Sequence, residues 1–153
     1  MPDAFLIVDD DPDVLKAAAA ALAREAGRID TAIAPDDLED RAHLYDAVLL
    51  DMNFVPGARD GAAGLDSLAR LHTADAALSV VLMTTYGGVA LAVQALKRGA
   101  ADFVLKPWRN EALADVMRAA AALTAERRAS GVALTLEELE RRAIARALSV
   151  YEG

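Results

Sequence analysis

The chain has 153 residues, a formal net charge of −8 and no cysteine, which excludes disulfides, thiolate metal sites and cysteine nucleophiles. Its 55% hydrophobic and 26% charged residues exclude global disorder, and its acidic balance makes this segment alone a poor DNA binder. The first residues carry no signal-peptide pattern, and no apolar stretch approaches the ~20 residues that cross a bilayer. We therefore expect a cytoplasmic protein without a membrane segment.

Five apolar runs predict five strands, with helix-like segments between and after them. Apart from the second, weaker run, which contains Asp30 and Thr31, the runs are largely continuous, which is typical of strands buried on both faces of a parallel sheet. They cover residues 4–8, 29–33, 47–50, 78–83 and 103–105. The expected helices cover residues 12–26, 36–43, 64–72, 89–97 and 110–128. Short, right-handed connections then predict an α/β fold, (βα)₅, with a doubly wound parallel five-stranded sheet. In such a sheet ligands bind at the carboxyl ends of the strands.

An acid-rich run follows the first predicted strand. Helix capping explains its second half: Asp11 is a favoured N-cap residue, Pro12 suits the first helical position and Asp13 complements the helix dipole. Capping does not require the two further carboxylates of Asp9 and Asp10 at the end of a buried strand. This pair is therefore a candidate for function.

Asp51 directly follows the third predicted strand. Alone it would be an ordinary loop aspartate. However, the first and third strands are commonly neighbours in this architecture, so Asp9, Asp10 and Asp51 are expected to converge. Two like charges 4 Å apart repel by about 4 kcal/mol at an effective dielectric near 20, so the cluster must take up protons or bind a cation. All-oxygen ligands that leave room for water favour Mg²⁺.

Polar side chains also follow the fourth and fifth predicted strands. Thr84 and Thr85 come after the fourth strand, where a threonine caps the next helix or hydrogen-bonds a phosphoryl oxygen. Lys106 follows the fifth strand, as a counter-charge for the carboxylates or as a phosphoryl ligand. The Lys106–Pro107 bond is a candidate cis peptide, which would aim the lysine inward.

This set of strand-end residues resembles the response-regulator receiver family over residues 4–123. The motifs that carry the resemblance span residues 6–11, 48–51, 81–84 and 102–107. The resemblance implies a flavodoxin-like receiver fold with Asp51 as the phosphoacceptor. It also implies that Mg²⁺, or Mn²⁺ in its place, is bound directly by Asp10 and Asp51. Asp9 would contribute largely through water, and Asn53 through its backbone carbonyl.

The same resemblance implies which residues bind the phosphoryl group and which respond to it. Thr84 and Lys106 would hold the phosphoryl oxygens. Thr84 and Phe103, which stands at the family's aromatic switch position, would then reshape a surface. The residues expected to tune access and dephosphorylation are Asn53, Thr85 and Tyr86. The sequence departs from the family in its long loop 52–60, and in Thr85, where alanine or glycine is usual.

The resemblance further implies the partners and the role. A sensor histidine kinase would supply the phosphoryl group, and phosphorylation would favour a homodimer within a transcriptional regulator. The domain would be a phosphoacceptor with Mg²⁺-dependent self-phosphorylation and slow self-dephosphorylation, and not an enzyme in the usual sense.

Residues 1–128 are the expected receiver domain, and residues 129–153 the expected linker and C-terminal helix. Residues 135–144 resemble the first helix of a Fis-type helix-turn-helix domain, or form a dimerisation segment. No recognition helix follows. We therefore expect contact with DNA only through an output domain that is incomplete or absent in this chain.

Two alternatives remain. The first is a receiver-like interaction or dimerisation module that is never phosphorylated, and a Mg²⁺ titration would separate it from a working site. The second is a haloacid-dehalogenase-type phosphohydrolase. That class needs a second aspartate two residues after the nucleophile, where Asn53 stands, and a nucleophile on the first strand instead of the third.

Overall fold

The computed structural model describes residues 3–52, 62–85 and 88–130. In these ranges strands and helices alternate as predicted. The strands are β1 (Ala4–Val8), β2 (Arg28–Ala32), β3 (Ala47–Asp51), β4 (Ser79–Thr84) and β5 (Asp102–Leu105). The helices are α1 (Pro12–Leu22), α2 (Leu38–Arg41), the 3₁₀ turn η1 (Ala42–Leu44), α3 (Ala62–Ala74), α4 (Val89–Lys97) and α5 (Asn110–Ser130).

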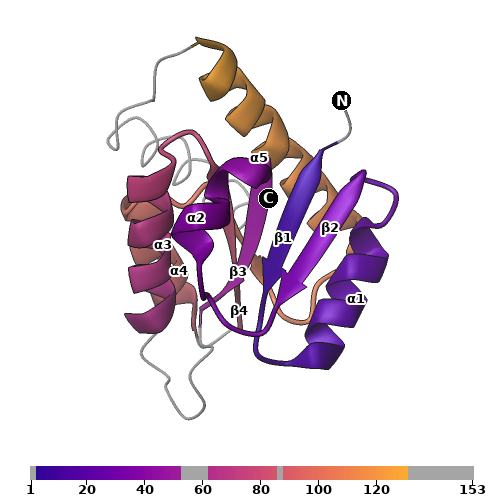
Figure 1. Cartoon of the computed structure of the whole chain (residues 1–153). Coiled ribbons are helices and arrows are strands. Elements are labelled where there is room, and N and C mark those ends of the chain that lie inside the picture. The colour runs from indigo at the N-terminus through magenta and orange to yellow at the C-terminus, as the bar shows by residue number, and fades with distance from the viewer. Residues whose placement is uncertain (1–2, 53–61, 86–87, 131–153) are drawn as a thin grey trace, which may run out of the picture.

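The five strands form one parallel sheet in the order β2-β1-β3-β4-β5. Helices α1 and α5 cover one face of the sheet, and α2, α3 and α4 cover the other (Figure 1). The order of strands reverses between β1 and β3, and in such sheets the crevice at this point receives the ligand. The predicted doubly wound α/β fold is therefore confirmed.

Each face of the sheet belongs to a separate half of the core, because side chains alternate across a strand. From β1, Phe5 and Ile7 pack on the side of α1 and α5, whereas Leu6 and Val8 pack on the side of α2, α3 and α4. All four are at most 1% exposed. Burial on both sides explains why the strand is a continuous apolar run.

The start of α1 confirms the capping interpretation, because Asp11 Oδ1 accepts a hydrogen bond from the Asp13 N–H over 2.9 Å. The end of the helix differs from the prediction: α1 stops at Leu22 instead of residue 26. The chain then turns, and the Gly27 N–H donates to the Asp3 carbonyl over 2.8 Å. This hydrogen bond joins the residues just before β1 and β2, and the chain needs the turn after Leu22 to reach it, so the helix ends there.

In α4 the buried face coincides only in part with the one that the larger apolar residues indicate in the sequence. Val89, Val93 and Leu96 recur at helical spacing, yet Val93 is 36% exposed. The buried residues are Ala92, Ala95 and Leu96. Short alanine side chains let the helix lie close to the sheet, which leaves the bulkier valine outside.

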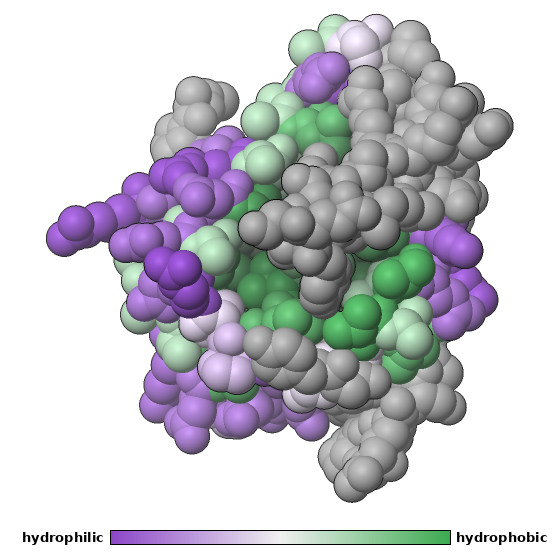
Figure 2. Space-filling model, turned by 180° about the vertical axis from the view of Figure 1, so that it is seen from behind, coloured by the Kyte–Doolittle hydropathy of each residue, from purple (hydrophilic) through white to green (hydrophobic). Residues whose placement is uncertain are grey.

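The described surface carries few large apolar side chains. Those that are exposed are Ile33, Leu44 and Val93. Seen from behind, apolar surface gathers in the middle of the molecule and hydrophilic side chains flank it (Figure 2). Among the described helices, none is long and apolar enough to cross a membrane.

Helix α5 continues to Ser130, past its predicted end at residue 128. Residues 129 and 130 thus still belong to the helix, and the division into a receiver domain and a following linker stays a prediction. Near this end, the Ser79 N–H donates to Thr124 Oγ1 over 2.9 Å, which bonds the helix to the start of β4. Residues 131–153 lie outside the described part, so the C-terminal helix and its Fis-type likeness remain predictions.

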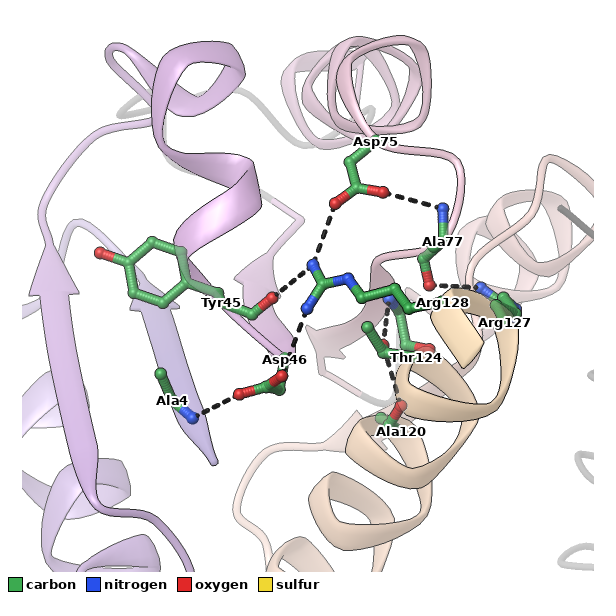
Figure 3. Close-up of polar contacts among 10 residues, drawn as sticks. Ala4, Tyr45, Asp46, Asp75, Ala77, Ala120, Thr124, Arg127 and Arg128 are labelled. Carbon is green, nitrogen blue, oxygen red and sulfur yellow. Dashed lines mark hydrogen bonds and ion pairs between the residues drawn. The ribbon is translucent and has the colours of Figure 1, made fainter. Parts of the chain in front are cut away.

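Arg128 ties the last turn of α5 to the amino ends of the strands (Figure 3). Its guanidinium donates to the Tyr45 carbonyl over 2.8 Å, and lies 3.0 Å from Asp75 and 3.3 Å from Asp46. Asp46 Oδ2 in turn accepts from the Ala4 N–H over 2.8 Å. One arginine thus joins α5 to the starts of β3 and β1 and to the loop before β4.

Candidate metal centre at the carboxyl edge of the sheet

Three carboxylates meet at the carboxyl edge of the sheet. Asp9 and Asp10 follow β1, Asp51 is the last residue of β3, and these strands pair with Val8 opposite Leu50. One carboxylate oxygen from each aspartate lies within 4.8 Å of the other two. Asp9 is 1% and Asp51 5% exposed, whereas Asp10 is open to solvent. The predicted convergence of these side chains is confirmed.

Lys106 bridges two of the carboxylates. Its Nζ donates to Asp9 Oδ2 over 2.7 Å and to Asp51 Oδ1 over 3.0 Å. The Lys106 N–H donates to the Thr84 carbonyl over 2.8 Å, and the Lys106–Pro107 peptide is cis, as predicted. Burial lowers the pKa of Lys106, but hydrogen bonds and charges from Asp9 and Asp51 outweigh burial, so its pKa lies above the ordinary value. The lysine is therefore charged at neutral pH.

Carboxylates outnumber positive charges among the described residues of this cluster. In the described part of the chain, three carboxylates face one ammonium group. Burial, followed by the hydrogen bond and charge of Asp9, raises the pKa of the Asp10 carboxyl. Excess negative charge on oxygen ligands, with one ligand open to solvent, suits a hard divalent cation that keeps some of its water. The residues present therefore fit Mg²⁺.

Thr84 ends β4 and is 2% exposed. Its Oγ1 is buried and has no hydrogen-bond partner among the described residues. A buried hydroxyl without a partner costs about 1–3 kcal/mol, so the position calls for an explanation such as a ligand. Thr85, the next residue, is exposed, and its effect on access to Asp51 stays a prediction.

The other predicted site residues are packed in the core or lie outside the described ranges. Phe103 in β5 is 9% exposed and packs in the same core half as Leu96 of α4. Core packing accounts for this placement, and a switching role for Phe103 stays a prediction. Asn53 and Tyr86 lie outside the described residues, as does the loop 53–60.

Sequence reasoning missed two glycines beside the site. A Cβ added at Gly64, in the first turn of α3, would lie 2.8 Å from the carbonyl oxygen of Met52, the residue after Asp51. A Cβ added at Gly88 would lie 1.8 Å from Thr84 Oγ1. The first contact joins α3 to the residue after β3, and the second lies in the short connection between β4 and α4, so the periodicity of a single element reveals neither.

A cavity of about 530 Å³ opens beside Lys106, between α1 and the start of α5. Trp108 borders it, packs against the core half that includes α1, and donates from Nε1 to Asn110 Oδ1 over 3.2 Å. The residues that line the cavity are Asp13, Val14, Ala17, Lys106, Pro107, Trp108 and Asn110. Lys106 and Trp108 therefore line the same cavity.

Residues 5–118 match the response regulator receiver domain family. This match covers more than half of the chain, so the chain belongs to that family. The C4-dicarboxylate transport transcriptional regulatory protein DctD of Pseudomonas aeruginosa is 36% identical over 121 residues, 75% of this chain and 24% of DctD. The transcriptional regulatory protein FixJ of Azorhizobium caulinodans is 35% identical over 130 residues, 82% of this chain and 59% of FixJ.

Solved structures agree with this assignment. The N-terminal signal receiver domain of a two-component response regulator from Bacteroides fragilis has a TM-score of 0.71 at 35% identity, over 79% of this chain and 98% of that one. The receiver domain of NtrX from Brucella abortus has a TM-score of 0.68 at 32% identity, over 77% and 98%. The chain thus matches isolated receiver domains almost in full, but only 24% and 59% of the two regulators above.

Proposed function

We propose that this domain is a phosphorylation-activated receiver in which Asp51 accepts a phosphoryl group from a sensor histidine kinase. One observation carries the proposal: Lys106 Nζ pairs with Asp51 at 3.0 Å, inside a cluster that also holds Asp9 and Asp10. A carboxylate nucleophile, a fixed cation and a place for a metal ion are the groups that phosphoryl transfer to an aspartate requires. Membership of the receiver family supports the proposal.

The proposed metal ligands are Asp10 and Asp51 directly, Asp9 largely through water, and the backbone carbonyl of Asn53. Both oxygens of Asp9 already accept hydrogen bonds, from the Asp11 N–H over 2.9 Å and from a lysine over 2.7 Å, which supports an indirect role. The exposure of Asp10 supports a direct one. Mg²⁺, or Mn²⁺ in its place, would neutralise charge on the transferring phosphoryl group.

In the proposed step, a carboxylate oxygen of Asp51 attacks the phosphorus of a phosphohistidine in line with the P–N bond. The new O–P bond forms as the P–N bond breaks, and the imidazole leaves with the electron pair and takes up a proton. The ammonium of Lys106 and the hydroxyl of Thr84 would hold the phosphoryl oxygens. Slow hydrolysis of the acyl phosphate would restore Asp51, and its rate would set the lifetime of the phosphorylated state.

The proposed response begins at Thr84, whose buried hydroxyl has no hydrogen-bond partner among the described residues. Binding a phosphoryl oxygen would provide that partner. Phe103, at the edge strand β5, would then move and reshape the surface formed with α4 and α5. A local charge change would in this way bias a surface with two arrangements.

The proposed setting is a cytoplasmic transcriptional regulator that forms a homodimer on phosphorylation. The relatives reported above are named as transcriptional regulators, which supports this setting. DNA would be contacted by an output domain, because the receiver itself is acidic. Residues 131–153 are proposed to connect to that output or to form a dimerisation helix.

The test is the intact mass of the protein after incubation with acetyl phosphate and Mg²⁺. We expect wild type to gain one phosphoryl group, and Asp51→Asn, which keeps the shape of the side chain, to gain none. Omission of Mg²⁺ should abolish the gain in wild type. A folded wild-type protein that binds Mg²⁺ and gains no mass would contradict the proposal and favour a receiver-like interaction module.

A further inference from the structure

The hydroxyl of Thr84 occupies the space that a side chain at position 88 would need. An added Cβ on Gly88 would lie 1.8 Å from Thr84 Oγ1 and 3.1 Å from Thr84 Cβ. The first distance is far inside van der Waals contact. Any residue other than glycine at position 88 therefore forces the Thr84 side chain out of its present orientation.

The backbone of Gly88 does not itself require glycine. Its φ of −98° and ψ of 7° lie in a region open to other residues. Its N–H donates to the Thr85 carbonyl over 2.8 Å, a turn that leads into α4 and that any residue except proline can make. The need for glycine at this position comes from the Thr84 side chain and not from the local fold.

Rotation about the Cα–Cβ bond of Thr84 permutes three substituents, the hydroxyl, the methyl and a hydrogen, among three staggered positions. The hydroxyl now occupies the position nearest Gly88, and the methyl carbon lies 3.5 Å from the added Cβ. One rotation would bring the methyl group to the crowded position, and the other would bring the hydrogen. With alanine at position 88, only the orientation with the hydrogen there remains.

We propose that Gly88 is a positioning residue. Because it has no side chain, it leaves room at the start of α4 for the Thr84 hydroxyl in a resting orientation. In this orientation Oγ1 makes no hydrogen bond to Asp51 or Lys106. Because it is buried without a partner among the described residues, rotation of the side chain out of this orientation breaks no hydrogen bond. The inference rests on the proposed function of Thr84 as a ligand of the phosphoryl group. Gly88 thereby sets how readily Thr84 turns toward Asp51.

The first test is a double-mutant cycle on the stability of the unphosphorylated protein. We expect Gly88→Ala to lower the urea midpoint in wild type, and to lower it much less in Thr84→Ala, where the crowded group is gone. Thr84→Val is the matched control, because it keeps the branched shape and should keep the penalty. Equal penalties in all three backgrounds would overturn the proposal, since alanine would then act only as a poorer helix cap.

The second test measures the affinity for beryllofluoride, a phosphoryl mimic, in the presence of Mg²⁺ by the fluorescence of Trp108. Removing a resting orientation that competes with binding should make Gly88→Ala bind about three- to tenfold more tightly than wild type. In Thr84→Val, which lacks the hydroxyl, Gly88→Ala should change nothing. Unchanged or weaker binding by Gly88→Ala in the wild-type background would overturn the proposal.

The two tests separate this inference from the function on which it rests. If Thr84 does not bind the phosphoryl group, Thr84→Val will bind beryllofluoride as tightly as wild type. That result refutes the role of Thr84 while the stability cycle still reports the contact with Gly88. If instead Gly88→Ala lowers stability equally with and without the Thr84 side chain, and Thr84→Val still weakens binding of beryllofluoride, then Thr84 keeps its role and Gly88 has none.

Discussion

Lys106 Nζ donates to Asp9 Oδ2 over 2.7 Å, although the two residues lie 97 positions apart in the chain. In the sheet, β3 and β4 separate β1 from β5, so the lysine reaches across the ends of the intervening strands. The same Nζ also donates to Asp51, at the end of β3. One ammonium group therefore links the carboxylates at the ends of β1 and β3, and among the described residues the three carboxylates of this cluster outnumber it.

Asp10→Asn is expected to stabilise the protein in the absence of divalent cations. Although the residue is exposed, partial desolvation of its carboxyl and the neighbouring Asp9 raise its pKa, so ionisation of Asp10 costs stability at pH values above that pKa. Because the side chain is exposed and screened, we expect a gain of only about 0.5–1 kcal/mol in the free energy of unfolding. Urea unfolding at pH 7 with a chelator measures it.

The same variant should lose the stabilisation that Mg²⁺ gives to wild type, because a proposed direct ligand is gone. Asp13→Asn is the control, since Asp13 is an exposed acid on α1 outside the carboxylate cluster. It should destabilise slightly, by about 0.3–1 kcal/mol, through the helix dipole, and should keep its response to Mg²⁺. Destabilisation by Asp10→Asn without metal would contradict the charge argument.

Gly64→Ala is expected to destabilise the protein by about 1–3 kcal/mol, because the added Cβ overpacks against backbone. The atom it meets is the Met52 carbonyl oxygen at 2.8 Å, which cannot rotate away as a side chain can. Helix propensity alone predicts the opposite sign, a gain of about 1 kcal/mol for alanine in place of glycine. The sign of the change in the free energy of unfolding, measured in urea, therefore shows whether the contact or helix propensity dominates.

Ala69→Gly provides the matched control in the same helix, at an exposed position. Propensity should dominate there, and glycine should cost about 1 kcal/mol. A stabilised Gly64→Ala would show that α3 does not press on the backbone next to Asp51. A strongly destabilised variant that also binds Mg²⁺ more weakly would show that this contact positions the site.

Arg128→Ala is expected to loosen the last turn of α5. The guanidinium joins the Tyr45 carbonyl, Asp46 and Asp75 at 2.8, 3.3 and 3.0 Å. Hydrogen bonds to charged groups contribute about 1.5–3 kcal/mol, which partial exposure at the surface reduces toward ~1 kcal/mol. Amide hydrogen exchange should quicken in the last turn of α5 and stay unchanged at its first turn.

Arg118→Ala is the comparison in the same helix. Arg118 pairs with Asp115 and with Glu25, and its side chain is 53% exposed. An ion pair of this kind contributes at most about 1 kcal/mol, and its loss should leave exchange in the last turn unaltered. Equal effects of the two substitutions on that turn would refute a specific role of Arg128.

The contact between Asp30 and Tyr45 predicts a loss of stability in acid. Asp30 Oδ2 accepts a hydrogen bond from the Tyr45 hydroxyl over 2.6 Å. This bond, followed by that from Arg28, lowers the pKa of Asp30 below 3.8. A lowered carboxyl pKa stabilises the fold above the unfolded value, and the stabilisation is lost as the pH falls through the folded value.

We therefore expect Asp30→Asn to cost about 1 kcal/mol at pH 7, and progressively less as the pH falls below 3.8. Tyr45→Phe, which removes the donor, should show the same trend. Free energies of unfolding in urea at pH 7, 5 and 3 measure both variants. A difference from wild type that is as large at pH 3 as at pH 7 would rule out ionised Asp30 as the source.

The layers of the fold, and the acidic and basic residues that meet at one edge of the sheet, could be predicted from the sequence. Apolar runs indicated the four strands other than β2, because both faces of the sheet are covered there, and polar residues at the ends of those runs indicated the edge with the candidate site. Asp9, Asp10, Asp51 and Lys106 were found in this way and do converge. The carboxyl ends of parallel strands share one edge of the sheet, so residues that directly follow the strands can be predicted to lie close together.

Contacts between elements could not be predicted from the sequence, because no local pattern specifies them. The choice of an alanine face in α4, the end of α1 at Leu22 and the last turn of α5 each depend on what another element presents. The approach of Gly64 to Met52 has the same origin. Periodicity describes one element at a time, whereas a close contact depends on the distance between two, which packing of the whole core determines.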